Sequence, residues 1–199
     1  MAKTPVVLGF LGVIFLLQMA AQATMAVWSY YVRFQFEWTE LDIGLGATLY
    51  GVLLVVSQAG LTGVMIKRFG AKRTAIVGLL IGLPSYLISA FATDSWMIIL
   101  AIVVGTVAGV TFPAMQQMMS ERISEDAQGE LQGAVASTMS ITSIIGPVIM
   151  TGTFGYFADS EGLFFPGAPF LLAALFGYAS LALLWRVVSK LTPARQETG

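Results

Sequence analysis

Charged side chains in this sequence are confined to short clusters, and the stretches between the clusters are long enough to cross a lipid bilayer. A hydrocarbon core ~30 Å thick needs about 20 apolar residues in helical form. Lipid offers the backbone no hydrogen-bond partner, so such a stretch must form a helix. We therefore expect an all-α polytopic membrane protein with six transmembrane helices. The six stretches without Asp, Glu, Lys or Arg are residues 5–32, 43–66, 74–93, 95–120, 131–158 and 162–185.

The composition agrees with a chain that is largely surrounded by lipid. Hydrophobic residues make up 57% of the sequence and charged residues 11%, against roughly 25% charged residues in soluble domains. There is no Cys and no His, which removes thiolate chemistry and the commonest metal ligand. No Ser–His pair, Asp pair or metal cluster is available at membrane depth for catalysis. We expect membrane lipid around the chain, and neither an enzyme, a metal, a cofactor nor a nucleic-acid partner.

The basic residues predict the orientation in the membrane. Six helices place both termini on one side, and nine of the ten basic residues fall on that side, with Arg33 as the exception. Basic residues are enriched in cytoplasmic loops. We expect a multi-pass protein of the inner or plasma membrane with both termini cytoplasmic. One domain, residues 1–191, would precede a short cytoplasmic tail, 192–199. The helices are expected at about 5–31, 43–66, 74–92, 96–119, 131–156 and 168–188.

The four Trp residues lie near the predicted helix ends, where Trp often anchors a helix at the membrane surface. An equally simple interpretation is that they are packed or lipid-facing aromatic residues. Trp28, Trp38 and Trp96 are near outer ends, and Trp185 is near an inner end.

A basic loop is expected between the second and third helices, reading Gly-Val-Met-Ile-Lys-Arg-Phe-Gly-Ala-Lys-Arg over residues 63–73. It resembles the loop signature of the major facilitator superfamily, Gly-x-x-x-Asp-Arg-x-Gly-Arg/Lys-Arg. The sequence departs from the family at Lys67, where the family often has Asp. The resemblance implies a gating loop; the alternative is a generic basic loop at the cytoplasmic surface. The matching residues are Gly63, Arg68, Gly70, Lys72 and Arg73.

Three further motifs lie in the fourth and fifth helices: Pro-Ala-x-Gln-x-x-x-Ser from 113, Gly-x-Leu-Gln-Gly from 129 and Ile-Gly-Pro from 145. Their order is similar to the C-terminal half of the tetracycline/proton antiporter branch of the same superfamily. The resemblance implies one half of the family fold, built from two inverted three-helix repeats at about 5–92 and 96–188. It also implies a transporter half for drug or small-molecule efflux of the proton-antiporter type, as in antibiotic resistance.

A single six-helix half can form one wall of a transport pathway, so we expect it to act as a parallel homodimer or with a second six-helix half. The alternative is a non-transporting membrane assembly protein, or a truncated remnant of a full-length transporter. Proton-coupled transporters usually carry an ionisable residue inside a span, and none lies in the middle of any span here. The sequence therefore assigns no coupling mechanism.

Polar side chains within the expected spans are amides and hydroxyls. A buried amide is costly in lipid unless it faces protein or water, so we expect these residues to point inward. They could line a cavity that hydrogen-bonds a substrate, or they could bond neighbouring helices. The candidates for a substrate cavity are Gln18, Gln22, Tyr50, Gln58, Thr111, Gln116 and Ser140.

Small residues and prolines predict how the helices pack and bend. Gly pairs four residues apart, at 78 and 82 and at 105 and 109, allow helix backbones to approach closely. Pro84, Pro113 and Pro147 should bend the third, fourth and fifth helices, because proline interrupts helical hydrogen bonding.

Overall fold

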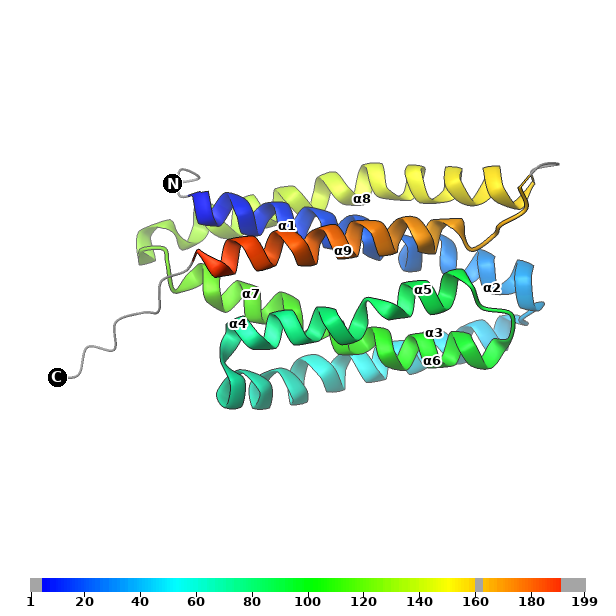
Figure 1. The fold of residues 1–199 in the computed structure, drawn as a ribbon, viewed down its shortest axis with the longest axis horizontal. Helices are drawn as coiled ribbons and strands as arrows, with labels where there is room; N and C mark the ends of the chain where they lie inside the picture. Colours follow the sequence, from blue (N-terminus) through cyan, green and yellow to red (C-terminus); the bar gives the residue numbers. More distant parts are fainter. Residues whose placement is uncertain (1–4, 160–162, 191–199) are drawn as a thin grey trace.

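The structure is a computed structural model that describes residues 5–159 and 163–190, and this part of the chain contains helices and short connections without strands. The helices run along the long axis of the molecule (Figure 1). Within these described ranges, five helical segments are long and apolar enough to cross a membrane. One of them, Glu40–Ala90, has 51 residues and folds back on itself at Gly70. The all-α fold with six spans is therefore confirmed.

We number the spans 1 to 6 in chain order. Span 1 contains α1 (Pro5–Gln22), η1 (Ala23–Val27) and α2 (Trp28–Phe36), and span 2 contains α3 (Glu40–Val55), η2 (Val56–Leu61) and α4 (Thr62–Gly82) as far as Gly70. Span 3 is the rest of α4 with α5 (Pro84–Ala90), and span 4 contains α6 (Ser95–Thr106), η3 (Val107–Val110) and α7 (Thr111–Ser120). After the short turn η4 (Glu125–Ala127), span 5 is α8 (Gln128–Ala158) and span 6 is α9 (Ala168–Ser189).

The chain reverses between spans 2 and 3 within a single residue, Gly70. Its backbone has φ 79° and ψ 156°, a region that residues with a Cβ rarely adopt. The Thr74 hydroxyl donates to the Gly70 carbonyl at 2.9 Å, which supports the start of the next helix. Residues 67–73, the expected loop, are thus helical on both sides of Gly70. The second and third helices are therefore longer than predicted.

The helices at the opposite end of the molecule also extend beyond the stretches without charge. Span 1 continues to Phe36 rather than ending at 31, and it stops where Glu37 adopts φ 55°. Span 2 begins at Glu40 rather than 43, because Thr39 and Asp42 form a capping box. In that box the Thr39 N–H donates to the Asp42 carboxylate at 2.9 Å. Charged residues can occupy these turns because they lie at the polar surface of the bilayer.

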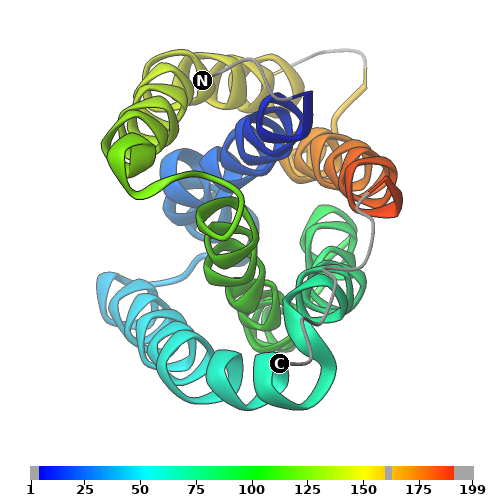
Figure 2. The same cartoon turned by 90° about the vertical axis from the view of Figure 1, so that its left-hand side faces the viewer.

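Spans 2 and 5 lie at the two edges of one face of the bundle, and spans 1 and 4 lie between them (Figure 2). Spans 3 and 6 cover the opposite side. The core is formed where spans 1, 3, 4 and 6 meet, and it includes the buried side chains Phe10, Leu79, Met115 and Leu184. We call the surface formed by spans 1, 2, 4 and 5 the four-span face.

Spans 3 and 4 approach each other closely at Gly82. A Cβ added at this residue would lie 2.8 Å from the Ala108 nitrogen and 3.0 Å from its Cα. These distances leave no room for a side chain, in agreement with the close approach expected from the glycine pairs. The prolines differ in effect. In span 3, α4 ends at Gly82 and α5 begins at Pro84, while Leu83 between them keeps a helical backbone. In span 4, a 3-10 turn precedes the helix that holds Pro113. The expected bend at Pro147 involves no break, because α8 is continuous there.

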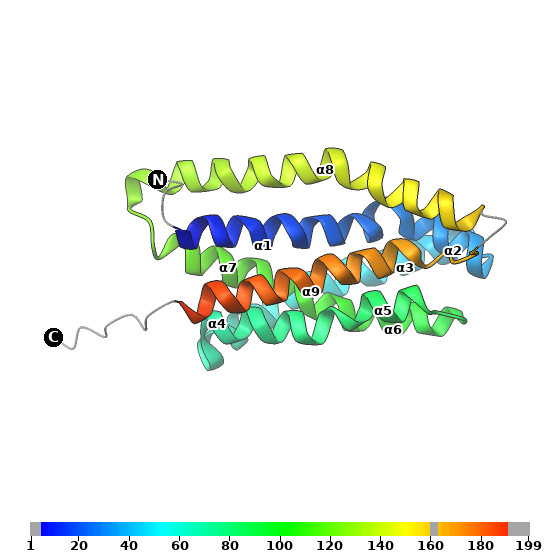
Figure 3. The same ribbon diagram turned by 45° about the horizontal axis from the view of Figure 1, so that its top comes forward.

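The start of α1 and the end of α9 lie at the same end of the bundle (Figure 3). The Gly70 turn and the connection between α7 and α8 lie at this end too. We call it the basic end, because these two connections and the end of α9 carry most of the basic residues. Arg33 lies at the other end, where it forms a salt bridge with Glu40. Lys3, Glu161, Arg195 and the tail 192–199 are outside the described residues. Cytoplasmic placement of the basic end stays a prediction.

Candidate substrate-binding site

Three of the six spans contain an irregular turn near their middle. The turns η1 in span 1 and η2 in span 2 are π-helical, and η3 in span 4 is a 3-10 turn. A π turn weakens the regular backbone hydrogen bonding and frequently marks a functional site. The hydroxyl of Thr62, the first residue of α4, donates to the Ser57 carbonyl in η2 at 2.9 Å. All three spans belong to the four-span face.

A cavity of about 220 Å³ lies between spans 1 and 2 beside η1. Met25 at its mouth is 75% exposed. Because Met25 and Ala47 are both exposed, the cavity is open at the surface. Its walls are otherwise mainly aromatic and aliphatic. The lining residues are Thr24, Met25, Trp28, Ala47, Tyr50 and Ile102.

A second cavity of about 80 Å³ lies next to the first and shares Thr24, Trp28, Tyr50 and Ile102 with it. Span 3 adds three hydroxyl groups to its wall, from Ser85, Tyr86 and Ser89. The Tyr86 and Thr24 side chains both line this cavity. We call the larger space the outer cavity and the smaller one the inner cavity.

The two cavities together can hold an amphipathic molecule. The outer cavity offers apolar contacts, including the Trp28 and Tyr50 rings. The inner cavity offers hydroxyl groups that can donate and accept hydrogen bonds. Neither lining contains an ionisable acid or base other than Tyr, so the cavities suit an uncharged polar group. Apolar pockets with a few polar groups are typical ligand sites.

Of the predicted cavity residues, Tyr50 lines both cavities. Three of the four predicted amides, all except Gln18, contact neighbouring spans. Gln22 packs against span 5, where a Cβ added to Gly146 would lie 3.0 Å from the Gln22 Cβ. Gln58 approaches span 4 in the same way, and its Cγ lies 3.7 Å from a Cβ built on Gly109. Near the basic end, the Gln132 amide donates to the Gln116 oxygen at 3.2 Å and links spans 4 and 5.

The remaining predicted cavity residues lie apart from the two cavities. Gln18 is half-buried in α1. The Thr111 hydroxyl is buried and donates to the Ala75 carbonyl of span 3 at 3.2 Å, which is a packing contact between helices. Ser140 is exposed, and its hydroxyl donates to the Ala136 carbonyl of its own helix at 2.9 Å. Their role in substrate binding stays a prediction.

The predicted gating residues lie around the Gly70 turn. Lys72 donates to the Val188 carbonyl near the end of α9 at 3.1 Å, so it ties span 3 to span 6. The Arg68 guanidinium lies 5.6 Å from the centre of the Phe69 ring. Arg73 is exposed. Gly63 is helical and open, since a Cβ added there would meet nothing within 4 Å.

The sequence analysis missed the hydroxyl groups of span 3. Ser85 and Ser89 are four residues apart and therefore share one side of the helix. That spacing, directly after Pro84, was the available signal. It could not identify the partner, because only the packing of span 3 against spans 1 and 4 brings these residues to Thr24. Trp38 is also packed rather than free, with its indole donating to the Ser95 hydroxyl at 2.8 Å.

Comparison with known proteins agrees with this fold. The "Tetracycline resistance protein, class C" of Escherichia coli is 35% identical over 155 residues, which are 78% of this chain and 39% of that protein. The class G protein of Vibrio anguillarum is 32% identical over 143 residues, 72% of this chain and 36% of that protein. The human "Hippocampus abundant transcript-like protein 1" is 24% identical over 159 residues, 72% of this chain and 31% of that protein.

The chain thus spans between 31% and 39% of the length of these relatives. Residues 10–199 match the family described as "Major Facilitator Superfamily". The match covers nearly the whole sequence and agrees with the six apolar spans. Members of this superfamily are transporters rather than enzymes, and the chain belongs to the Major Facilitator Superfamily.

Proposed function

We propose that this chain is one six-helix half of a transporter that exports uncharged or amphipathic drug-like molecules. The observation that carries the proposal is the pair of adjoining cavities on the four-span face, with apolar walls outside and hydroxyl groups inside. Two relatives are named tetracycline resistance proteins. A tetracycline, which carries a polycyclic body with polar groups, is therefore the first probe to use.

Cavity size supports a requirement for a second half. Sites for drug-sized ligands usually measure about 300–1,000 Å³ and enclose most of the ligand. The outer cavity of one chain measures about 220 Å³ and is open at the surface. A second wall across the four-span face would both enlarge and close the site. The second half would be another copy of this chain or a six-helix unit of the same kind.

The exposed apolar surface of spans 2 and 5 supports the same arrangement. In the most apolar 18-residue stretch of the Glu40–Ala90 segment, 17% of the residues are buried. The share is 22% in the Glu125–Ala158 segment, which contains span 5, and 39% in each of the other three segments. A two-fold axis along the membrane normal would place α3 of one copy against α8 of the other, because these helices form opposite edges of the face. In this arrangement both copies have the same orientation. Two-fold dimers are the commonest closed assemblies of identical chains.

The three-plus-three repeat and the cytoplasmic termini belong to the same proposal. The Gly63–Arg73 segment would act in gating or assembly rather than in substrate contact. In support, the Gly70 turn lies at the basic end, and its Lys72 side chain connects two spans.

Two matched threonines test the proposed site. Thr24 lines both cavities, whereas the Thr48 hydroxyl donates to its own helix at the Gly44 carbonyl. Thr24→Val should weaken tetracycline binding about fivefold, which corresponds to ~1 kcal/mol for one lost hydrogen bond. Thr48→Val should leave binding unchanged. Calorimetry on purified protein and drug accumulation in cells that express it are the measurements.

The outcomes separate the proposal from its alternative. Weaker binding and higher accumulation with Thr24→Val alone would support a transport site at the two cavities. Equal binding by the two variants would place the site elsewhere. If the parent chain neither binds tetracycline nor lowers its accumulation, whether expressed alone or with a partner half, the non-transporting alternative gains support.

A further inference from the structure

A separate groove of about 350 Å³ is lined by residues of spans 3 and 6 near the basic end. These two spans cover the side opposite the four-span face (Figure 2). The groove is formed by the Gly70 turn, including Phe69 just before it, by the start of span 3 and by the last turns of span 6. Most of its wall is apolar or aromatic, and two basic residues complete it. The lining residues are Phe69, Lys72, Arg73, Ile76, Val77 and Trp185.

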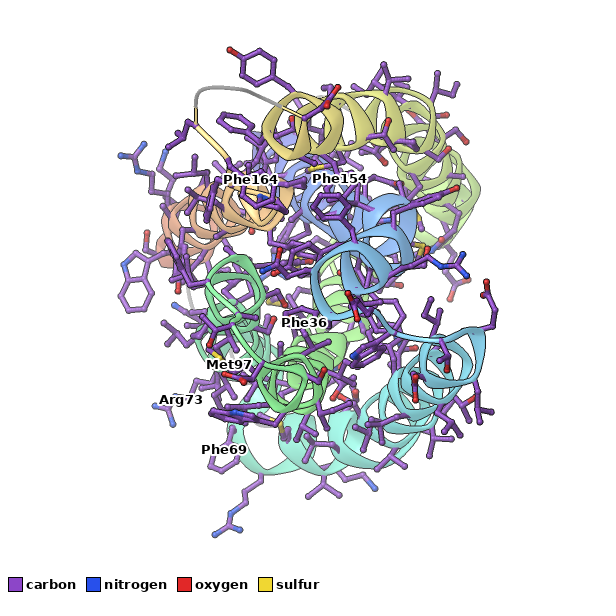
Figure 4. All side chains as sticks on the ribbon, turned by 90° about the vertical axis from the view of Figure 1, so that its right-hand side faces the viewer. Phe36, Phe69, Arg73, Met97, Phe154 and Phe164 are labelled. Atoms are coloured by element: carbon purple, nitrogen blue, oxygen red, sulfur yellow. The ribbon has the colours of Figure 1, made fainter. Side chains whose placement is uncertain are left out.

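The polar and apolar parts of the groove follow each other along span 3. Lys72 and Arg73 come directly after the Gly70 turn, at the end of the span. Ile76 and Val77 lie one helical turn farther into it, about 5 Å along the axis. Arg73 and Phe69 project outward from the bundle on the side of α9 (Figure 4). The groove thus presents positive charge at the membrane surface and apolar side chains at greater depth.

The two helical segments that form the groove carry basic residues and no acidic ones. Residues 62–90 and 168–190 contain no Asp or Glu, and they contain Lys67, Arg68, Lys72, Arg73, Arg186 and Lys190. Among the described residues, the Arg73 side chain forms neither a hydrogen bond nor a salt bridge. Lys72 gives one hydrogen to the Val188 carbonyl, and an ammonium group has three to give. An anion placed at the groove would therefore find free donors on both side chains.

Trp185 indicates that the occupant is a lipid. Its ring lines the groove and is 60% exposed. Trp is enriched at the level of the lipid headgroups. Basic pockets between transmembrane helices on the cytoplasmic side bind anionic headgroups. A small inorganic anion would meet the two cations but would leave the apolar wall uncovered.

We propose that this groove binds an anionic phospholipid. The phosphate of the lipid contacts Arg73 and Lys72. The part of one acyl chain nearest the headgroup lies along Ile76, Val77 and Trp185. This site is distinct from the two cavities between spans 1 and 2. It faces away from the four-span face, so lipid reaches it whether the chain is single or paired. The proposal therefore does not depend on the transported substrate or on the dimer.

Fluorescence quenching by brominated lipids tests the site directly. The purified protein is placed in phosphatidylcholine vesicles, and a growing fraction of the lipid is replaced by phosphatidylglycerol or phosphatidylcholine with brominated chains. The signal of Trp185 is the difference between the parent protein and Trp185→Phe. We expect phosphatidylglycerol to be preferred over phosphatidylcholine at Trp185. Equal quenching by the two lipids would overturn the proposal.

Two substitutions in the same turn distinguish a defined site from general attraction to positive charge. Arg73→Gln should lower the preference about fivefold, the ratio that corresponds to ~1 kcal/mol for one basic residue near the surface. Lys67→Gln removes the same charge from an exposed residue outside the groove and should leave the preference unchanged. Equal effects of both changes would show diffuse attraction and overturn the site.

A second pair of variants tests the contribution of the apolar wall. Val77→Phe should reduce the preference for phosphatidylglycerol, because it fills the space for the chain. Leu80→Phe adds the same ring to an exposed residue of the same helix outside the groove and should have no effect. Inorganic phosphate in excess should not displace the lipid; full displacement by phosphate would show that the chain contributes nothing. Arg73→Lys, which keeps the charge, should retain most of the preference for phosphatidylglycerol. It is the variant of Arg73 to measure if Arg73→Gln fails to fold.

Discussion

The close approach of spans 3 and 4 at Gly82 predicts that even one added methyl group destabilises the protein. In Gly82→Ala the new Cβ would lie 2.8 Å from the Ala108 nitrogen. The obstacle is backbone, so it cannot be relieved by a rotamer change. Overpacking of this kind costs ~1–3 kcal/mol. The higher helix propensity of alanine offsets ~1 kcal/mol of that cost.

A matched substitution isolates the packing cost. Gly152 is exposed in α8, and a Cβ added there would meet nothing within 4 Å. Gly152→Ala therefore gains the helix propensity without the clash. The difference between the two variants should equal the overpacking cost. For ~2 kcal/mol in a protein of this size, Gly82→Ala should have the lower Tm by about 4–8 °C.

Thermal unfolding in mild detergent, followed by circular dichroism, measures both variants under the same conditions. If Gly82→Ala and Gly152→Ala have the same Tm, the two spans are not packed as closely as the structure places them. A higher Tm for Gly82→Ala would contradict the packing argument more strongly.

Three further results are expected. Gly70→Ala should destabilise the protein by ~1–3 kcal/mol, because φ 79° is strained for a residue with a Cβ. Gly63→Ala should not lower the Tm of the protein, and equal Tm values for the two variants would contradict the positive φ at Gly70. Lys72→Met should speed amide hydrogen exchange in the last turn of α9, since it removes the bond to the Val188 carbonyl; unchanged exchange would show that this bond does not hold the turn. In a chain without native Cys, an impermeant thiol reagent should label Asp94→Cys but not Lys67→Cys in intact cells, and the reverse pattern would invert the topology.

The sequence predicted the number of spans and their centres because the bilayer imposes a strong and simple constraint on charge. It was less informative about the ends, where charged residues are tolerated within helices. Span 1 passes Arg33 and stops only at Glu37, whose left-handed backbone ends the helix. At the other end of the molecule, one glycine makes the whole turn that the sequence suggested as a longer loop. Both differences arise from local backbone conformation that hydrophobicity does not specify.

The candidate site was harder to predict, because polar residues in a membrane helix have several possible partners. Tyr50 was identified from its place in an apolar span, and it does line both cavities. The partners of Gln22 and Thr111 depend on which helices meet, and they proved to be Gly146 and the Ala75 carbonyl. The π turns η1 and η2 carry no Pro and no sequence signal that we recognised.

The central claim is that a second six-helix half covers the four-span face. Val52 in α3 and Val148 in α8 are 56% and 72% exposed. They lie at similar depth, about 18 Å from the start of α3 and about 15 Å from the end of α8 at 1.5 Å per residue. A two-fold arrangement with parallel copies would bring Val52 of one copy towards Val148 of the other. Leu175 in α9 is 64% exposed on another side of the bundle and provides the control.

The most direct test co-expresses two differently tagged copies in membranes, one with Val52→Cys and the other with Val148→Cys, and treats them with a short bifunctional thiol reagent. We predict a cross-linked dimer that carries both tags. We predict none when Leu175→Cys replaces Val148→Cys. Cross-linking through position 175 with none through 148, or full drug export by a chain that remains monomeric, would contradict the account.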